Sequence, residues 1–207
     1  NGAGKSTTFH MISGLTRVSS GSIQLDETDI TNLSLYQRAL IGIGYLPQQV
    51  SVFERMTVAQ NIACILETNP LFPCKTSQTE QLHKLLCQFQ LQPIANTLAA
   101  CVSGGEKRRT EIARMLAKSP NYLLLDEPFA GVDPKSILEI KQLIKQLQQQ
   151  TGAGVLISDH NAQETLDLAD YVHVMHQGHI LAGGTSSEIR SNRDVIRHYL
   201  GEKSHTS

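Results

Sequence analysis

The sequence opens with the stretch Asn1-Gly2-Ala3-Gly4-Lys5-Ser6-Thr7, and a helical pattern follows from Thr7 to Leu15. Glycines allow backbone N–H groups to turn inward around phosphate oxygens, and the helix behind them adds the positive end of its dipole. The pattern therefore predicts that all seven residues bind nucleotide phosphates, with Lys5 at the β- and γ-phosphates and Ser6 on Mg²⁺. The alternative is a glycine-rich turn that only starts a helix.

A second informative stretch is Leu123-Leu124-Leu125-Asp126-Glu127-Pro128. A short apolar run that ends in acidic residues indicates a buried parallel strand. In a nucleotide site of this kind, Asp126 would hold the Mg²⁺ shell and Glu127 would polarise the attacking water. The alternative is a pair of surface carboxylates that cap the next element.

The third stretch, Val102-Ser103-Gly104-Gly105-Glu106, precedes a basic helix and lies shortly before the acidic strand. Taken alone it is an ordinary helix N-cap and turn. In this position it resembles the signature motif of the ABC ATPase family, Leu-Ser-Gly-Gly-Gln, which in some branches ends in Glu. Other elements of that family follow in the expected order, namely Gln48 of the Q-loop, Gly131-Val132-Asp133 of the D-loop and the switch histidine His160. Taken singly, Gln48 could be a surface loop residue and His160 a helix cap.

The resemblance implies one α/β domain over residues 1–207, a P-loop NTPase fold whose mixed or parallel sheet is wound by helices. A helical subdomain at about 57–118 would be inserted in its RecA-like core. It also implies that two copies pair head to tail around ATP and Mg²⁺, because the signature turn acts on the nucleotide of the other copy. The implied roles are catalysis by Glu127, His160 and Gln48, Mg²⁺ binding by Ser6, Gln48 and Asp126, nucleotide binding by Ser103, Gly104 and Gly105, and dimer contact by Asp133.

Within the family, the stretches 129–134, 159–161 and 199–202 are most similar to the ATPase of the bacterial lipopolysaccharide exporter. Branched-chain amino-acid importer ATPases share the Ser-Gly-Gly-Glu signature and the terminal Tyr-Leu-Gly, and they are the alternative. The exporter resemblance implies two membrane permease subunits that dock beside the Q-loop, at Phe53, Glu54 and Arg55. Phe53 could instead be a core residue. The expected location is the cytoplasmic face of the bacterial inner membrane, with membrane contact only through partners.

The sequence departs from the family pattern at its start. The first glycine of G-x-x-x-x-G-K-[ST] would precede residue 1, so we expect an incomplete copy that lacks an N-terminal strand and the adenine-stacking aromatic of the family. Each loss would weaken ATP binding or the sheet. A poorly folded chain or a non-catalytic fragment is therefore a further alternative. Smaller departures are Gln49 and Ala99-Ala100-Cys101.

Composition narrows the function further. The 207 residues carry a net charge of -1 with basic residues spread along the chain, which disfavours a nucleic-acid partner. No apolar run approaches the roughly 18 residues needed to cross a membrane. The four cysteines have no C-x-x-C pair and indicate reduced thiols. The string His173, His176, His179 crosses a predicted hairpin, which disfavours a metal site. Two other classes of ABC protein do not transport. A DNA-repair protein of the family would insert a long coiled coil before the signature motif, and a translation factor would carry two cassettes. The short spacing and single cassette of this chain disfavour both classes.

The pattern of apolar residues predicts the order of elements. We expect helices at 7–15, 106–117, 136–150, 162–168 and 194–200, a mostly helical stretch at 57–98, strands at 21–25, 41–46, 122–125 and 154–158, and a hairpin of 171–175 with 179–182.

Overall fold

The computed structural model describes residues 2–192 and 195. Its centre is a three-stranded parallel sheet in the order β3-β4-β5, formed by Ile43–Leu46, Tyr122–Asp126 and Gly154–Ser158. Helices connect each strand to the next, as parallel pairing requires. The predicted buried parallel strand is thus confirmed, and the chain has the predicted α/β architecture of parallel strands and helices.

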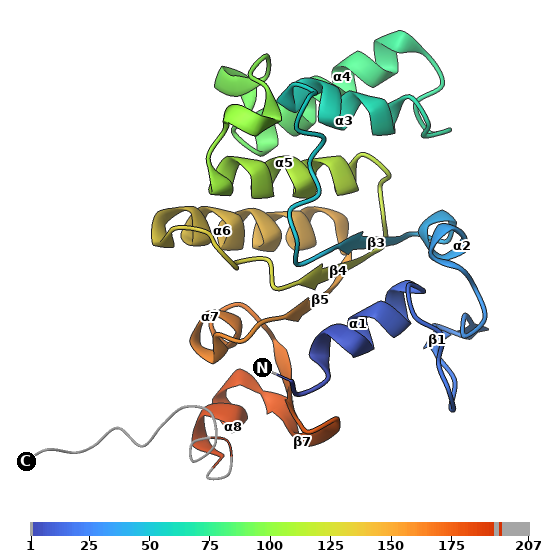
Figure 1. Cartoon of the computed structure of the whole chain (residues 1–207), viewed down its shortest axis with the longest axis vertical. Helices are drawn as coiled ribbons and strands as arrows, with labels where there is room; N and C mark the ends of the chain where they lie inside the picture. Colours follow the sequence, from blue (N-terminus) through green and yellow to red (C-terminus); the bar gives the residue numbers. More distant parts are fainter. Residues whose placement is uncertain (1, 193–194, 196–207) are drawn as a thin grey trace, which may run out of the picture.

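Helices cover both faces of this sheet (Figure 1). Side chains alternate along β4: Leu123 and Leu125 pack on the side of α5 and α6, and Leu124 packs on the opposite side with Phe9 of α1. This alternation follows from the two-residue period of a strand. Because β4 is covered on both sides, its sequence is continuously apolar rather than alternating.

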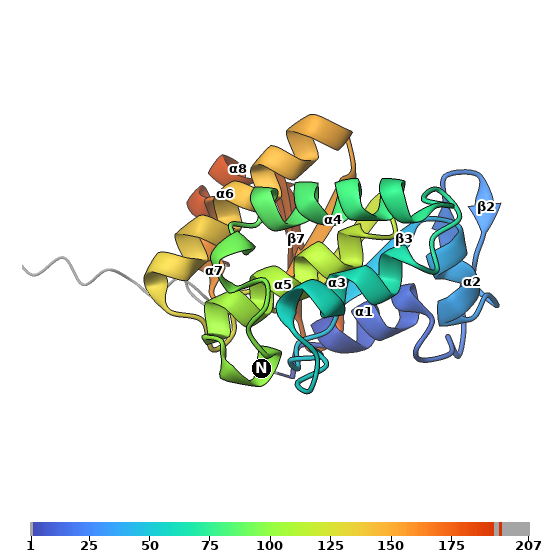
Figure 2. The ribbon, with the colours of Figure 1, turned by 90° about the horizontal axis from the view of Figure 1, so that it is seen from above.

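A helical lobe stands between β3 and β4. It consists of α3 (Val58–Leu66), α4 (Lys75–Gln88), two 3₁₀ turns (Gln92–Ile94 and Ala99–Cys101) and α5 (Gly104–Leu116). Figure 1 shows α3 and α4 above α5, Figure 2 shows α3 and α4 running side by side, and residues of all three helices share one buried core. The mostly helical character predicted for 57–98 is confirmed. Its prolines lie between or at the ends of helices, where a missing N–H is tolerated.

Two of the predicted helices are present with slightly different bounds, and each ends at a glycine. α1 (Lys5–Ser13) ends at Gly14, whose φ of 85° only glycine adopts readily. α6 (Pro134–Thr151) begins at the N-cap Asp133 and ends at Gly152, with a φ of 67°. Both helices therefore end at a glycine in the left-handed conformation.

The remaining elements are short. They are the hairpin β1 (Gln24–Leu25) and β2 (Thr28–Asp29), the helices α2 (Leu35–Leu40), α7 (Ala162–Leu166) and α8 (Ser186–Ser191), and the hairpin β6 (Tyr171–His176) and β7 (His179–Thr185). The second hairpin was predicted. α2 and α8 were not, because six residues give too little periodicity, although both start with a capping box. The helix predicted at 194–200 lies outside the described residues, except for Val195.

Two expectations about the chain's environment can be compared with the structure. Among the helices of the described part, none combines the length and apolar character needed to span a bilayer. All four cysteines, Cys64, Cys74, Cys87 and Cys101, are free thiols, as their spacing predicts.

Candidate functional site

The glycine-rich loop leads directly into α1. Gly2 and Gly4 have φ values of 80° and 96°, and Gly4 is the N-cap of the helix. A glycine cap offers no side-chain acceptor to the N–H groups of the first turn, which carries Lys5 and Ser6. Thr8 holds the start of the helix, since both its N–H and its Oγ1 donate to the Gly4 carbonyl at 3.0 Å. This geometry suits an anion. Asn1 lies outside the described residues.

The turn of the β6–β7 hairpin supports this loop. The Gly178 N–H donates to the Ala3 carbonyl at 3.0 Å. A Cβ added to Gly4 would lie 3.5 Å from the Gly178 Cα, so the two backbones approach closely. The sequence predicted the hairpin but not this contact, because Ala3 and Gly178 lie near opposite ends of the chain.

The two acidic residues after β4 have different environments. Asp126 is 1% exposed, and its Oδ1 accepts a hydrogen bond from Ser158 Oγ at the end of β5. Burial, and then the charge of Asp126, raise the pKa of Tyr45 on β3 to about 12, so Tyr45 stays neutral. Glu127 begins the turn after β4. Ser158 was not predicted as a site residue, because it becomes a partner of Asp126 only through the register of β4 and β5.

The Glu127 carboxylate joins the ends of all three parallel strands. Gln48, which follows β3, donates from Nε2 to Glu127 Oε2 at 2.8 Å. His160, which follows β5, places Nδ1 3.4 Å from the same oxygen, and its side chain is 54% exposed. The carboxyl ends of parallel strands meet at one edge of a sheet, where ligands commonly bind. The structure thus brings together the three residues predicted to be catalytic.

The signature turn lies elsewhere. Ser103 is the N-cap of α5: its Oγ accepts from the Glu106 N–H at 3.3 Å, and Glu106 Oε2 accepts from the Ser103 N–H at 2.7 Å. These hydrogen bonds lower the pKa of Glu106. α5 packs on the opposite side of the sheet from α1 (Figure 1), so within one chain Ser103 and the phosphate loop are on different faces. That Ser103 serves a second copy stays a prediction.

Close packing explains the second glycine of the signature turn. A Cβ added to Gly105 would lie 2.3 Å from Ser136 Oγ on α6, whereas one added to Gly104 would lie 3.3 Å from the Gly131 carbonyl. Asp133, the predicted interface residue, is exposed and caps α6 through a 3.0 Å hydrogen bond from the Ser136 N–H. Hydrogen bonds from Ser136 lower the pKa of Asp133.

Phe53 is at the surface. Its side chain is 49% exposed, which excludes the alternative that it is a core residue. The Asn61 side chain fixes its backbone, accepting from the Phe53 N–H at 2.8 Å and donating to its carbonyl at 3.1 Å. The Arg114 guanidinium lies 4.9 Å from the ring centroid. A depression of about 550 Å³ is lined by Val50, Val52, Phe53, Glu54 and Arg55, so it includes every predicted docking residue.

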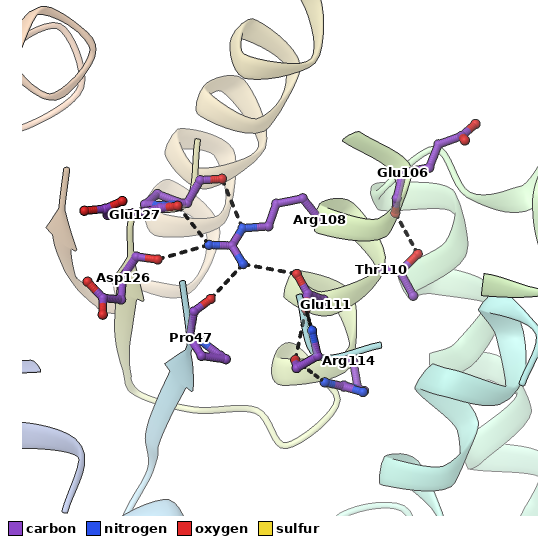
Figure 3. A network of polar contacts seen from close by, with 10 residues as sticks. Pro47, Glu106, Arg108, Thr110, Glu111, Arg114, Asp126 and Glu127 are labelled. Carbon is purple, nitrogen blue, oxygen red and sulfur yellow. Dashed lines mark hydrogen bonds and ion pairs between the residues drawn. The ribbon is translucent and has the colours of Figure 1, made fainter. Parts of the chain in front are cut away.

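A buried arginine that the sequence did not single out connects these parts (Figure 3). Arg108 on α5 is 4% exposed and donates hydrogen bonds to the carbonyls of Pro47, after β3, and of Glu127, after β4. The sequence did contain a signal that Arg108 is buried. Arg108 lies four positions before the buried Ile112 and so on the same face of the helix. Within 2–192 and 195, no three His, Cys, Asp or Glu side chains are grouped so that they could hold a metal ion.

Comparisons with known proteins agree with this geometry. The family model described as "ABC transporter" matches residues 1–130. The chain is 47% identical over 203 residues to the lipopolysaccharide export system ATP-binding protein LptB of Acidithiobacillus ferridurans, covering 98% of this chain and 83% of that protein. The LptB of Haemophilus influenzae is 46% identical over 204 residues, with 98% and 83% covered.

A solved structure shows the same fold. The ADP conformation of an ATP-binding cassette of an ABC transporter superimposes with a TM-score of 0.80 at 29% identity, covering 98% of this chain and 85% of that one. The chain belongs to the ABC transporter family, as an ATPase subunit.

Proposed function

We propose that this ATPase powers lipopolysaccharide export from the bacterial inner membrane, with Glu127 as the residue that orients and polarises the attacking water. The meeting of Gln48, Glu127 and His160 at one carboxylate oxygen is the observation that supports the site most directly. The likeness to the LptB proteins supports the transported substrate.

The chemistry in this site is mainly positioning and charge stabilisation. Lys5 neutralises phosphate charge, Glu127 orients water, and His160 contacts the γ-phosphate. Gln48 holds the Glu127 carboxylate in place through its 2.8 Å hydrogen bond. A general base with these properties contributes about 10²–10⁴-fold to a rate.

The residues around Asp126 fit a magnesium ion. The Ser6 hydroxyl, the Gln48 amide and the Asp126 carboxylate supply oxygen atoms, which are the ligands that Mg²⁺ prefers. Asp126 is buried and keeps its orientation through the Ser158 hydroxyl. When bound, the ion would supply positive charge beside the phosphates.

The working unit is a pair of chains arranged head to tail. Ser103, Gly104 and Gly105 of one copy close on the nucleotide held by residues 1–7 of the other, and Asp133 lies at the contact between them. The location of α5 on the face of the sheet opposite α1 supports this arrangement, because a single chain keeps the two halves of the site apart (Figure 1). The chain acts as one domain over 1–207, with the helical lobe at about 57–118 as its insertion.

Two membrane permease subunits dock at the depression that contains Phe53 and Arg55. An exposed aromatic ring among charged side chains is a suitable anchor for a partner helix. Docking there would hold the ATPase on the cytoplasmic face of the inner membrane through its partners.

A transport assay tests the proposal. The ATPase would be purified with its membrane subunits, reconstituted in liposomes that contain lipopolysaccharide, and assayed for ATP-dependent release of that lipid. We expect release by the parent complex and none by Glu127→Gln, which should still bind ATP. ATP-driven uptake of branched-chain amino acids in place of lipid release would favour the importer alternative. Equal hydrolysis by Glu127→Gln would reject the role of Glu127.

A further inference from the structure

The backbone at Glu127 has an unusual conformation. Its φ is 44°, in the left-handed region that residues with a Cβ rarely adopt. Such a conformation persists where surrounding contacts hold it, and it is common at functional sites. The Glu127 N–H donates to the Ser158 carbonyl at 2.9 Å, which fixes the peptide from the side of β5. Its carbonyl side must be held by other groups.

Arg108 supplies those groups from the opposite side of the turn (Figure 3). Its Nη2 donates to the carbonyls of Asp126 and Glu127, both at 3.1 Å, and its Nε donates to the carbonyl of Pro128 at 3.0 Å. Three successive carbonyls around the left-handed residue therefore share one guanidinium. Its Nη1 also donates to the carbonyl of Pro47 at 2.9 Å, directly before Gln48.

The guanidinium geometry matters as much as its charge. Arginine carries five N–H donors in a fixed planar fork, and the structure gives Arg108 five acceptors. Lysine would keep the positive charge but could not reach four carbonyls from a single ammonium group. The contacts of Arg108 therefore depend on its shape, and a conservative substitution separates shape from charge.

Glu111 fixes the other side of Arg108. Its Oε2 accepts from Arg108 Nη1 at 3.1 Å, and both side chains are almost completely buried, 4% and 0% exposed. Glu111 Oε1 accepts from the Ser51 N–H and from Ser51 Oγ, the latter at 3.0 Å. Ser51 lies between Gln48 and Phe53. The ion pair thus fastens the guanidinium to the segment that carries the predicted docking surface.

From these contacts we infer that Arg108 is a positioning residue for hydrolysis, which holds the backbone of Glu127 in the left-handed conformation that directs its side chain to Gln48 and His160. Glu111 keeps Arg108 aligned. Among the described residues, the Arg108 guanidinium donates hydrogen bonds to four backbone carbonyls and to Glu111, so it acts on the reaction by positioning the residues beside it. The inference rests on the proposed role of Glu127.

Arg108→Lys tests this in the complex with the membrane subunits. A displacement of the catalytic carboxylate by a fraction of an ångström to 1 Å should lower kcat about 10- to 100-fold. The Kd for ATP should stay within about twofold, because the phosphate loop is on the other face of the sheet. Arg109→Lys is the matched control, since the neighbouring Arg109 pairs with Glu139 on α6 and leaves the strand carbonyls alone. The Arg109→Lys control should keep a kcat close to that of the parent. Equal kcat values for Arg108→Lys and the parent, or an equal loss in both variants, would overturn the inference.

A double-mutant cycle distinguishes positioning from general structural support. Single-turnover hydrolysis of radiolabelled ATP would be measured for Glu127→Gln and for the double variant with Arg108→Lys. If Arg108 acts through Glu127, the double variant should be no slower than Glu127→Gln alone. A further 10-fold loss would show a role independent of Glu127 and would reject the inference.

Different results would reject the proposed role of Glu127 and the positioning role of Arg108. Parental turnover of Glu127→Gln would reject the proposed function of that residue, whereas an inactive Glu127→Gln with a fully active Arg108→Lys would reject only the positioning role. If Arg108→Lys does not fold, Glu111→Gln replaces it, because it keeps an oxygen for Ser51 but removes the charge that aligns Arg108. A lower kcat at unchanged ATP affinity would support the inference, and unchanged kcat would overturn it.

Discussion

The two faces of the parallel sheet are packed very differently. On the side of α5 and α6, Leu123 and Leu125 of β4 are 2% and 0% exposed and belong to the main core. On the side of α1, Leu156 of β5 is 41% exposed and borders a depression of about 280 Å³. One face is filled with side chains, and the other is partly open.

The two faces of the sheet contribute differently to the site: one positions Glu127, and the other carries the phosphate loop. The packed face carries Arg108, which holds the carbonyls after β4, and so it sets the position of Glu127. The other face carries α1, which begins at the phosphate loop. The groups that position the catalytic carboxylate and the loop proposed to hold the phosphates therefore belong to opposite faces of the sheet.

Leucine substitutions on the two faces of the sheet should have the largest and most different effects on the free energy of unfolding. Leu125→Ala should lower the free energy of unfolding by about 2–5 kcal/mol, because it leaves a cavity in a filled core. Leu156→Ala should cost about 1 kcal/mol or less, since much of that side chain is already in water. Urea unfolding of both variants measures the difference, and similar losses would mean that the two faces are equally packed.

Substitutions at the contact between α5 and α6 should have an intermediate effect on the free energy of unfolding. Gly105→Ala forces a methyl group against Ser136 and should destabilise the chain by about 1–3 kcal/mol, even though alanine favours a helix. Gly104→Ala, with more room, should stay within about 1 kcal/mol of the parent.

Thermal unfolding measures both glycine variants. Adding Ser136→Gly to Gly105→Ala should restore part of the loss by removing the opposing side chain. Failure of this second change to help would show that the crowding at Ser136 is not the cause.

A substitution at the start of α5 should have the smallest effect on the free energy of unfolding. Hydrogen bonds from Ser103 lower the pKa of Glu106 from its ordinary value of 4.5. A carboxylate whose folded pKa is lowered adds stability that is present above pH 4.5 and is lost as the pH falls through the folded pKa. The stability advantage of the parent over Glu106→Gln should therefore shrink as the pH falls below 4.5. Unfolding measured from pH 6 to pH 3 tests this, and a constant difference would contradict it.

Local patterns predicted much of the fold. The apolar run of β4 and the helical pattern of α6 are each encoded within a few residues, and both elements were found. Gln48 and His160 were named through the resemblance to the ABC ATPase family, and the structure places both beside Glu127 because each of the three follows a strand and parallel strands end at one edge. Six-residue helices such as α2 gave too short a pattern.

Other parts of the site could not be predicted, for a physical reason. Ser158 contacts Asp126 through strand register, Gly178 reaches Ala3 across most of the chain, and Arg108 gathers carbonyls from two separate loops. These contacts depend on tertiary packing, so a motif search along the chain passes over them. For Arg108, helix spacing placed the residue on a buried face without naming its acceptors.

The central claim is that one nucleotide is bound between the phosphate loop of one chain and the Ser103 turn of another. A crystal structure of Glu127→Gln with ATP and Mg²⁺ tests it most directly, since this variant should trap the bound state. We predict a head-to-tail pair in which Lys5 of one protomer and Ser103 of its partner contact the same γ-phosphate. Nucleotide bound at Lys5 with every Ser103 far from it, in all assemblies of the crystal, would contradict the account.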